Sequence, residues 1–197
     1  MKNSSPTFDN LSTTSSSEHA GVHIITMHKP PKNRLNSAYA QTIIRALRHI
    51  ERDLVKPSQP GHTFGGVCPF ALSCDYRVMN SKCGFLSMPP VNLGLHFEGI
   101  GALPRLKLGP RIARKMLLEA HKWTGKEAFA DGIVDAIAEP GQMLEVACKL
   151  AAEQALRASM GVYGLLRSEL WGEALEKFKR ISYTHRKKEG TEPKAKI

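Results

Sequence analysis

The sequence lacks any apolar run long enough to span a bilayer, and it has no N-terminal apolar segment of the signal-peptide type. It is also poor in cysteine: Cys68, Cys74, Cys83 and Cys148 have neither the paired spacing of a zinc site nor that of a disulfide framework. We therefore expect no membrane span, no metal centre and a reducing compartment. Cys68 and Cys74 have apolar neighbours and are predicted to be core residues.

Acidic residues are few relative to basic ones: 18 Asp and Glu against 28 Lys and Arg give a formal net charge of +10. The basic excess is concentrated in two stretches, which comprise Arg105, Lys107, Arg111, Arg114, Lys115, Lys122 and Lys126, and then Lys177, Lys179, Arg180, Arg186, Lys187 and Lys188. Such a surface suits a nucleotide with phosphates, or a nucleic acid. The sequence lacks a nucleic-acid-reading motif with interleaved aromatic residues, so nucleic acid is not expected as a partner. For any single lysine, a solvated helix face remains the simpler interpretation.

The length of 197 residues is that of one compact domain. Residues 1–20, rich in serine and threonine, are predicted to be a disordered leader, and 188–197 a charged flexible tail, which leaves 21–187 as the domain. Strands are predicted near 21–28, 76–79 and 84–87, and helices at about 36–55, 110–119, 125–131, 140–157 and 161–179. Asn36 is a candidate N-cap, and Gly132 stands where a C-cap would.

The most informative stretch is Gly61–Pro69, a loop with paired glycines that leads into the apolar segment Phe70–Cys74. Glycines allow positive φ angles and close approach of a ligand to the backbone. The N–H groups at the start of the following helix would point at that ligand, and the helix dipole favours partial negative charge there. One half of an oxyanion hole is built in this way, although a tight turn alone would also use two glycines.

From Gly61 to Val134 the chain resembles the enoyl-CoA hydratase/isomerase, or crotonase, superfamily. The matching stretches are GHTFGGVCPFALSCDYRVM at 61–79, then Phe85, then PPVNLGLHFEGIGALPRLKLGPRIARKMLLEAHKWTGKEAFADGIVD at 89–135. Upstream, residues 22–27 and 30–36 look like the family's first long strand and the turn into its first helix. The resemblance implies an α/β crotonase-like fold, a spiral of ββα units with a C-terminal helical trimerisation region. It also implies a coenzyme A thioester as substrate, no cofactor, and a homo- or hetero-trimer or hexamer.

The same resemblance assigns roles to residues of the glycine turn. It implies that the N–H of Gly66 belongs to the oxyanion hole and that Gly65 and Phe64 contact the substrate. The family's hydratases use two glutamates, and prolines stand at both of those positions here, Pro69 and Pro90. Because proline has no proton to give or take, hydration by two carboxylates is not expected.

One carboxylate does stand near the expected place. Glu98 follows the Leu-Gly-Leu loop and is placed like the single catalytic glutamate of the peroxisomal Δ3,Δ2-enoyl-CoA isomerases. One base suffices for that reaction, since it removes a proton from C2 of a 3-enoyl thioester and returns it at C4. His96, two residues away, is interpreted as structural or exposed, because no orienting partner is visible. Asp75 is interpreted as structural, bonding the backbone or Arg77.

A segment of the family's domain is missing from this sequence. In the family, a strand and the loop with the first oxyanion N–H lie between the first helix and the glycine turn. Here the predicted first helix runs almost directly into Pro60 and Gly61, so we place the gap between about 53 and 61, and the central sheet loses at least one strand. Removing one oxyanion donor typically costs on the order of a hundredfold to a thousandfold in rate.

The sequence ends Ala195-Lys196-Ile197, which resembles the Ser-Lys-Leu peroxisomal address. It predicts a peroxisomal location and an import receptor as a partner. The leading hypothesis is thus an enoyl-CoA isomerase of fatty-acid or secondary-metabolite thioester metabolism. The alternatives are a hydratase-like enzyme of a toxin or polyketide pathway, a catalytically inactive crotonase remnant, and a basic RNA-binding crotonase.

Overall fold

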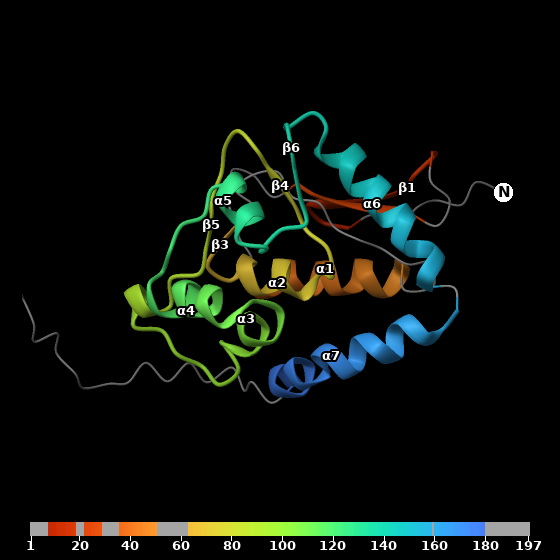
Figure 1. The fold of residues 1–197 in the computed structure, drawn as a ribbon. Helices are drawn as coiled ribbons and strands as arrows, with labels where there is room; N and C mark the ends of the chain where they lie inside the picture. The colour runs from red at the N-terminus through yellow and green to blue at the C-terminus, as the bar shows by residue number, and fades with distance from the viewer. Residues whose placement is uncertain (1–7, 19–21, 29–35, 51–62, 159, 180–197) are drawn as a thin grey trace, which may run out of the picture.

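The computed structural model describes residues 8–18, 22–28, 36–50, 63–158 and 160–179 (Figure 1). The strands are β1 (Leu11–Ser15), β2 (His23–Met27), β3 (Thr63–Phe64), β4 (Val78–Asn80), β5 (Leu86–Ser87) and β6 (Ala136–Ala138). The helices are α1 (Ser37–Ile50), α2 (Val67–Ser73), α3 (Ala102–Lys107), α4 (Pro110–Leu118), α5 (Gly125–Ala130), α6 (Met143–Ala158) and α7 (Val162–Lys179), with a 3-10 turn, η1, at Val91–Leu93. The fold is α/β, as expected, with much helix and little sheet.

The described strands form three separate pairs. β1 and β2 are antiparallel, with Leu11 opposite Met27, whereas β3–β5 and β4–β6 are parallel. A two-stranded pair is marginally stable on its own, so each of these pairs depends on the helices packed against it. The proposed gap at 53–61 lies outside the described residues.

The expectation of a disordered leader over residues 1–20 is wrong for the part that the structure describes. Residues 11–15 form β1, and the side chain of Leu11 is buried against Ile25 in a small core. Threonine is a good strand former, and Thr13 and Thr14 pair with Ile25 and Ile24 of β2. The prediction of disorder rested on the high serine content, and composition carries no information about which strands pair.

Two hydrophobic clusters meet at α2. The larger one is built by residues after β3, and its fully buried members include Leu72, Met116, Trp123 and Ile133. The smaller one joins β1, β2 and α1 through Leu11, Ile25, Tyr39, Ile43 and Ala46. Phe70 of α2 packs against the smaller cluster while Leu72 lies in the larger, so α2 connects the two.

The two helix ends predicted at Asn36 and Gly132 are confirmed, and the structure adds a third at the start of α5. The N–H of Tyr39 donates to Asn36 Oδ1 at 2.9 Å, which caps α1. α5 begins with a capping box between Thr124 and Glu127 and is followed by Gly132 at φ +69°. The sequence signals at Asn36 and Gly132 are local, which explains why these two ends could be predicted.

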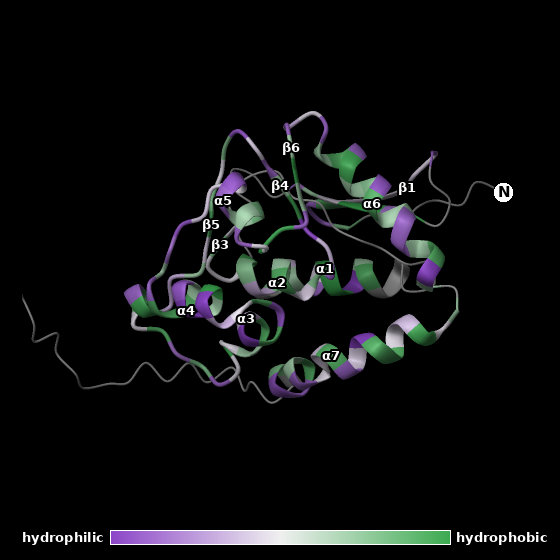
Figure 2. Cartoon of the chain, viewed as in Figure 1, coloured by the Kyte–Doolittle hydropathy of each residue, from purple (hydrophilic) through white to green (hydrophobic). Residues whose placement is uncertain are grey.

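The last two helices differ in how they pack. α6 lies over β4 and β6 and also contacts Val22 at the start of β2. α7 packs against α3, along the lower side of the view in Figure 1. Figure 2 shows hydrophobic turns along α7, and Leu165, Leu166, Leu170 and Leu175 are exposed there. No helix in the described part of the chain is long and apolar enough to cross a bilayer.

Candidate functional site

The glycine turn connects β3 to α2. Gly65 has φ +61°, a left-handed conformation that side-chain-bearing residues adopt only with strain. Gly66 is the N-cap of α2 at φ −63°, and a Cβ added to it would meet nothing within 4 Å. Gly65 is therefore required by backbone conformation, while Gly66 leaves open space beside the helix end.

The N–H of Gly66 has no hydrogen-bond acceptor among the described residues, whereas the N–H of Gly65 donates to Ser87 O at 3.0 Å. Groups at a helix start have no intrahelical acceptor, so such a donor is available to a ligand. Gly66 is exposed to solvent. The geometry thus leaves one backbone donor free at the predicted position.

Cys68 holds the turn against the strands. Its thiol contacts Thr63 O at 3.2 Å and Ser87 O at 3.1 Å, and the residue is fully buried. Burial raises the pKa of the Cys68 thiol to about 12, against a smaller lowering by the bond to Ser87. The predicted core role of Cys68 is confirmed, and a thiol that stays protonated is a poor nucleophile.

The loop that carries Glu98 leaves the same edge of the β3–β5 pair as the glycine turn. The two strands are parallel with Phe64 opposite Ser87, so Gly65 and Met88 both follow the carboxyl ends. The loop passes buried Pro89 and Pro90, then η1 and Gly94 at φ +57°. Glu98 begins the turn that precedes α3. Topology thereby brings the two predicted elements to one sheet edge.

Glu98 is exposed and makes no hydrogen bond or ion pair within the described part of the chain. His96 is also exposed, as the sequence interpretation allowed. Pro69 lies in the first turn of α2, where no N–H is needed, so proline is accommodated without loss of a helical bond. The carboxylate is thus free to approach a ligand, and it is open to water.

Phe64 begins a row of side chains beside the glycine turn. Its ring is 44% exposed and packs edge-to-face on Phe85 with centroids 5.9 Å apart. The ammonium of Lys122 lies 5.5 Å from the Phe85 ring centroid. A ligand at the turn would therefore find an aromatic surface with a cation beyond it. From the sequence, Lys122 was identified only as one member of a basic stretch, and its position beside Phe85 was not predicted.

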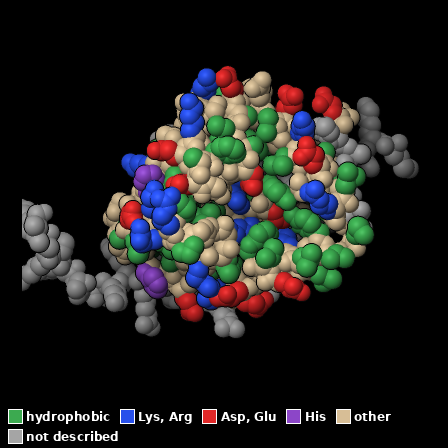
Figure 3. Space-filling view, in the orientation of Figure 1, with side chains coloured by type: hydrophobic (Ala, Val, Ile, Leu, Met, Phe, Trp, Pro, Cys, Tyr) green, Lys and Arg blue, Asp and Glu red, His purple; other side chains and the backbone are tan. Residues whose placement is uncertain are grey.

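The first basic stretch is not one free positive surface. Arg111 and Lys115 both pair with Asp131, at 3.4 and 3.7 Å, and Arg114 pairs with Glu119 at 3.3 Å. Figure 3 shows Lys and Arg side chains gathered near α4 with acidic ones among them. Lys122 and Lys126, both exposed, form no ion pair with any described carboxylate. Only some of the positive charges of this stretch are therefore available to bind a phosphate.

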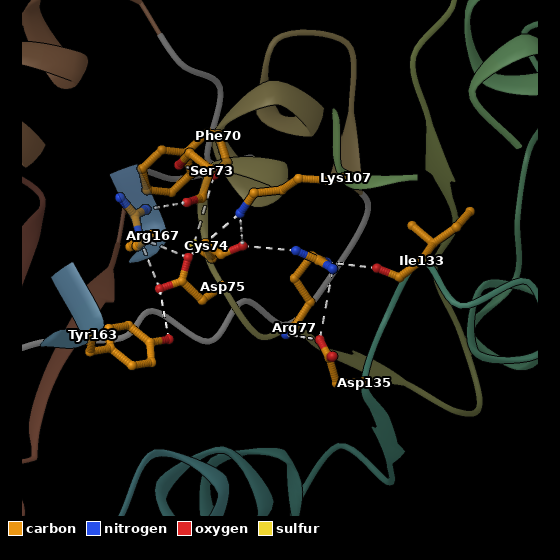
Figure 4. Close-up of polar contacts among 10 residues, drawn as sticks. All are labelled: Phe70, Ser73, Cys74, Asp75, Arg77, Lys107, Ile133, Asp135, Tyr163 and Arg167. Atoms are coloured by element: carbon orange, nitrogen blue, oxygen red, sulfur yellow. Dashed lines mark hydrogen bonds and ion pairs between the residues drawn. The ribbon is translucent and has the colours of Figure 1, made fainter. Parts of the chain in front are cut away.

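Asp75 makes structural contacts, as interpreted from the sequence, but the expected partner Arg77 is wrong. Asp75 pairs with Lys107 at 3.6 Å, accepts from Arg167 Nε at 2.9 and 3.0 Å, and accepts from Tyr163 Oη at 3.1 Å (Figure 4). Arg77 turns instead to Asp135 and to the Ile133 carbonyl. Sequence proximity favoured Arg77, whereas Arg167 is brought close only by the packing of α7.

Lys107 is the most perturbed cation of this cluster. Its side chain is 3% exposed, its ammonium donates to Cys74 O at 2.8 Å, and it lies 3.7 Å from the Trp171 ring centroid. Burial lowers the pKa of Lys107 to about 8, although the Asp75 carboxylate opposes this. The cluster joins α2, α3 and α7, and it holds none of the predicted site residues.

A hollow opens beside α2. It is lined by Thr63, Phe70, Ala71, Cys74, Tyr76, Arg77, Val78, Met79, Leu86 and Val134. Gly65, Gly66 and Glu98 do not line it. In the described residues, no group of His, Cys, Asp and Glu is arranged to hold a metal ion.

Comparison with known protein families gives a match to the enoyl-CoA hydratase/isomerase model over residues 59–181. The chain is 31% identical over 127 residues to the crotonyl-CoA hydratase of Syntrophomonas wolfei, covering 64% of this chain and 48% of that protein. It is 34% identical over 139 residues to the peroxisomal enoyl-CoA delta isomerase 1 of Arabidopsis thaliana, covering 66% and 58%. The chain spans about half the length of the curated relatives that it matches.

Solved structures show the same architecture. An enoyl-CoA hydratase/isomerase family protein from Pseudomonas syringae superposes with a TM-score of 0.75 at 16% identity, covering 87% of this chain and 96% of the other. An enoyl-CoA hydratase from Mycobacterium marinum gives a TM-score of 0.75 at 16% identity, covering 86% and 95%. The predicted crotonase-like fold is confirmed.

Proposed function

The chain belongs to the enoyl-CoA hydratase/isomerase family, and from this premise we propose that it binds an acyl-CoA thioester and shifts a 3-enoyl double bond to the 2-trans position. The observation that carries the proposal is the shared edge of the parallel β3–β5 pair. The turn with the free Gly66 N–H and the loop with Glu98 both leave the sheet there. An acid–base group and an oxyanion donor on one edge are what the reaction needs.

In the proposed reaction, the Glu98 carboxylate removes a proton from C2 of the thioester. The electron pair of that C–H bond forms a C1–C2 double bond, and negative charge moves to the thioester oxygen, where the Gly66 N–H donates a hydrogen bond. Glu98 then returns the proton to C4, where the electron pair of the C3–C4 double bond forms the new C–H bond. The C1–C2 electron pair moves to form the C2–C3 double bond, and the thioester carbonyl is restored. One residue thus takes and gives the same proton.

Isomerisation is favoured over hydration because Pro69 and Pro90 occupy the positions that the resemblance assigns to the hydratase acids. Named relatives include both hydratases and a delta isomerase, so the relatives alone do not choose. The choice rests on the residues of this chain. A single exposed glutamate supports proton transfer within a substrate better than activation of a water by two carboxylates.

The expected rate is low. Gly66 and Glu98 are both exposed, and hydrogen bonds and charges act more weakly in water than in a closed site. The proposed gap at 53–61 removes the first oxyanion donor, which leaves Gly66 as the remaining one. If the turnover is lost altogether, the chain is a non-catalytic member of the family that keeps its subunit contacts.

The nucleotide end of coenzyme A is proposed to lie along Phe64, Phe85 and Lys122. The rings offer a surface for the adenine or the pantetheine arm, and Lys122 and Lys126 offer unpaired cations for phosphate. The exposed leucines of α7 support the expected trimer or hexamer, because an apolar surface of this kind marks a subunit contact. A peroxisomal location is supported by the named peroxisomal and glyoxysomal relatives and by the terminal tripeptide, which lies outside the described residues.

The proposal is tested with the purified full-length chain and synthetic 3-enoyl-CoA and 2-enoyl-CoA thioesters of several chain lengths. Chromatography of the products should show 2-enoyl-CoA formed from the 3-isomer above the buffer rate. Water addition to 2-enoyl-CoA should be undetectable. A clear hydratase rate would overturn the assignment of the reaction, and the absence of both activities would favour the non-catalytic alternative.

A further inference from the structure

The hollow beside α2 is lined in part by Arg77, Val78 and Met79, at the start of β4. The ladder bonds from β4 to β6 involve Arg77 O, which accepts from Asp135 and Ala136, and Ser81 N, which donates to Ala138 O. Backbone groups of successive strand residues point to opposite edges. The N–H and C=O of Val78 therefore point away from β6, to the other edge of β4, and Val78 is one of the residues that line the hollow.

These two groups have no hydrogen-bond partner among the described residues. Within the described residues neither accepts nor donates outside the β4–β6 ladder, and Val78 is only partly exposed. A backbone donor and acceptor left unpaired in a partly buried position cost free energy, so native structures rarely leave them so.

The edge of β4 that faces away from β6 is open at Val78 but is covered at Asn80. A Cβ at Gly125 would lie 2.2 Å from Asn80 O, so α5 abuts the strand at that carbonyl. The rest of the hollow is mainly apolar, with Phe70, Met79, Leu86 and Val134 among its walls. The opening therefore combines apolar walls with a backbone donor and acceptor at one short edge.

We propose that this hollow receives an extended apolar strand from another polypeptide, which pairs with Val78 and extends the β4–β6 pair to three strands. An acyl chain would fill apolar space but would leave Val78 unpaired, whereas a peptide backbone supplies the matching donor and acceptor. The added strand would also stabilise the β4–β6 pair, because two strands alone are only marginally stable in water. The inference is independent of the proposed isomerase activity, because none of Gly65, Gly66 and Glu98 lines the hollow.

The test uses the full-length chain and a short fluorescein-labelled peptide of alternating threonine and valine. Its control is the same peptide with alternate backbone nitrogens methylated, which keeps the side chains and removes donors. Fluorescence anisotropy should show binding of the first peptide and about tenfold weaker binding of the second. Equal binding of the two peptides would show that the hollow takes up apolar side chains without backbone pairing, and would overturn the proposal. Equally effective displacement of both peptides by octanoyl-CoA would lead to the same conclusion.

Hydrogen exchange provides a readout that needs no mutation. The amide of Val78 should exchange more slowly when the peptide is bound, while the amide of Met79, which the register turns toward β6, should be unchanged. Val78→Lys should weaken peptide binding, and Leu118→Lys at an exposed position of α4 is the matched control that should not. Unchanged exchange at Val78 under saturating peptide, or no detectable peptide binding by the folded chain, would sink the idea.

Discussion

Arg167 holds Asp75 across 92 positions of sequence, donating from Nε to both carboxylate oxygens at 2.9 and 3.0 Å. Lys107 approaches the same carboxylate at 3.6 Å from the end of α3. One acidic residue at the end of α2 thus fixes two helices that come later in the chain. The arrangement explains how α7 is anchored although many of its leucines face solvent.

Replacing Asp75 by asparagine should lower the free energy of unfolding by about 2 to 4 kcal/mol, because it leaves a buried lysine and two other donors without their charged acceptor. Urea unfolding followed by circular dichroism measures the change. Glu173→Gln is the matched control, since Glu173 pairs with Arg105 and Lys177 at the surface and its loss should leave the midpoint nearly unchanged. Equal midpoints for the two variants would contradict the anchoring role.

Stability should depend on pH through Lys107. Its pKa is about 8 in the folded chain against 10.5 ordinarily, so between these values the unfolded chain binds more protons. The free energy of unfolding should therefore rise with pH across this window, by up to about 1.4 kcal/mol per unit, relative to Lys107→Met. The raised pKa values of Cys68 and Tyr163 make the free energy of unfolding fall with pH. Both groups are present in wild type and in Lys107→Met, so their effect cancels when the two stability curves are compared. Parallel stability curves for wild type and variant would refute the assignment.

Gly65→Ala should destabilise the chain by about 1 to 2 kcal/mol, because φ +61° is strained for alanine. Gly66→Ala should leave stability unchanged or raise it by up to about 1 kcal/mol, since alanine adopts φ −63° and ψ −16° without strain and its Cβ would lie in open space. Thermal melts of the two variants form a direct comparison. Similar losses at both positions would mean that the turn tolerates neither side chain and that φ is not the cause.

Glu98→Gln should reduce any isomerase rate by about a hundredfold to ten-thousandfold, as expected when an acid–base group is removed. The far-ultraviolet circular dichroism should not change, because the described structure gives Glu98 no structural partner. His96→Gln, two residues away and also exposed, is the control and should keep the rate. Loss of activity in the His96 variant with retention in the Glu98 variant would reverse the roles.

A fluorescent protein fused ahead of the chain should enter peroxisomes when Ala195-Lys196-Ile197 is present and remain in the cytosol when these three residues are removed. Co-localisation with a peroxisomal marker in living cells measures this. The same cytosolic distribution for both fusions would end the targeting hypothesis.

Elements with local signals could be predicted from sequence. Asn36 and Gly132 mark helix ends through local signals, and α4, α5 and α7 were found to within one or two positions. α3 was missed because a six-residue helix containing Pro104 gives almost no periodic signal. β3 and β6 were missed because two or three residues cannot show alternation.

The candidate site was predicted unevenly for the same reason. The glycine turn and Glu98 were identified by motif, and the segments that carry them leave the same end of the β3–β5 pair. The Asp75 cluster and the row from Phe64 to Lys122 depend on pairs far apart in sequence, so no local pattern contained them. In the second basic stretch, Lys177 pairs with Glu173, and the side chains of the other members lie outside the described residues.

The two tryptophans of the chain lie in contrasting places. Trp123 is fully buried in the larger core and donates from Nε1 to Asp131 at 2.9 Å, while Trp171 lies on α7 beneath the Lys107 ammonium. Fluorescence from Trp123 therefore reports on the interior, and that from Trp171, next to a cationic quencher, reports on whether α7 is docked. The chain thus carries two intrinsic optical probes, one for global unfolding and one for release of its last helix.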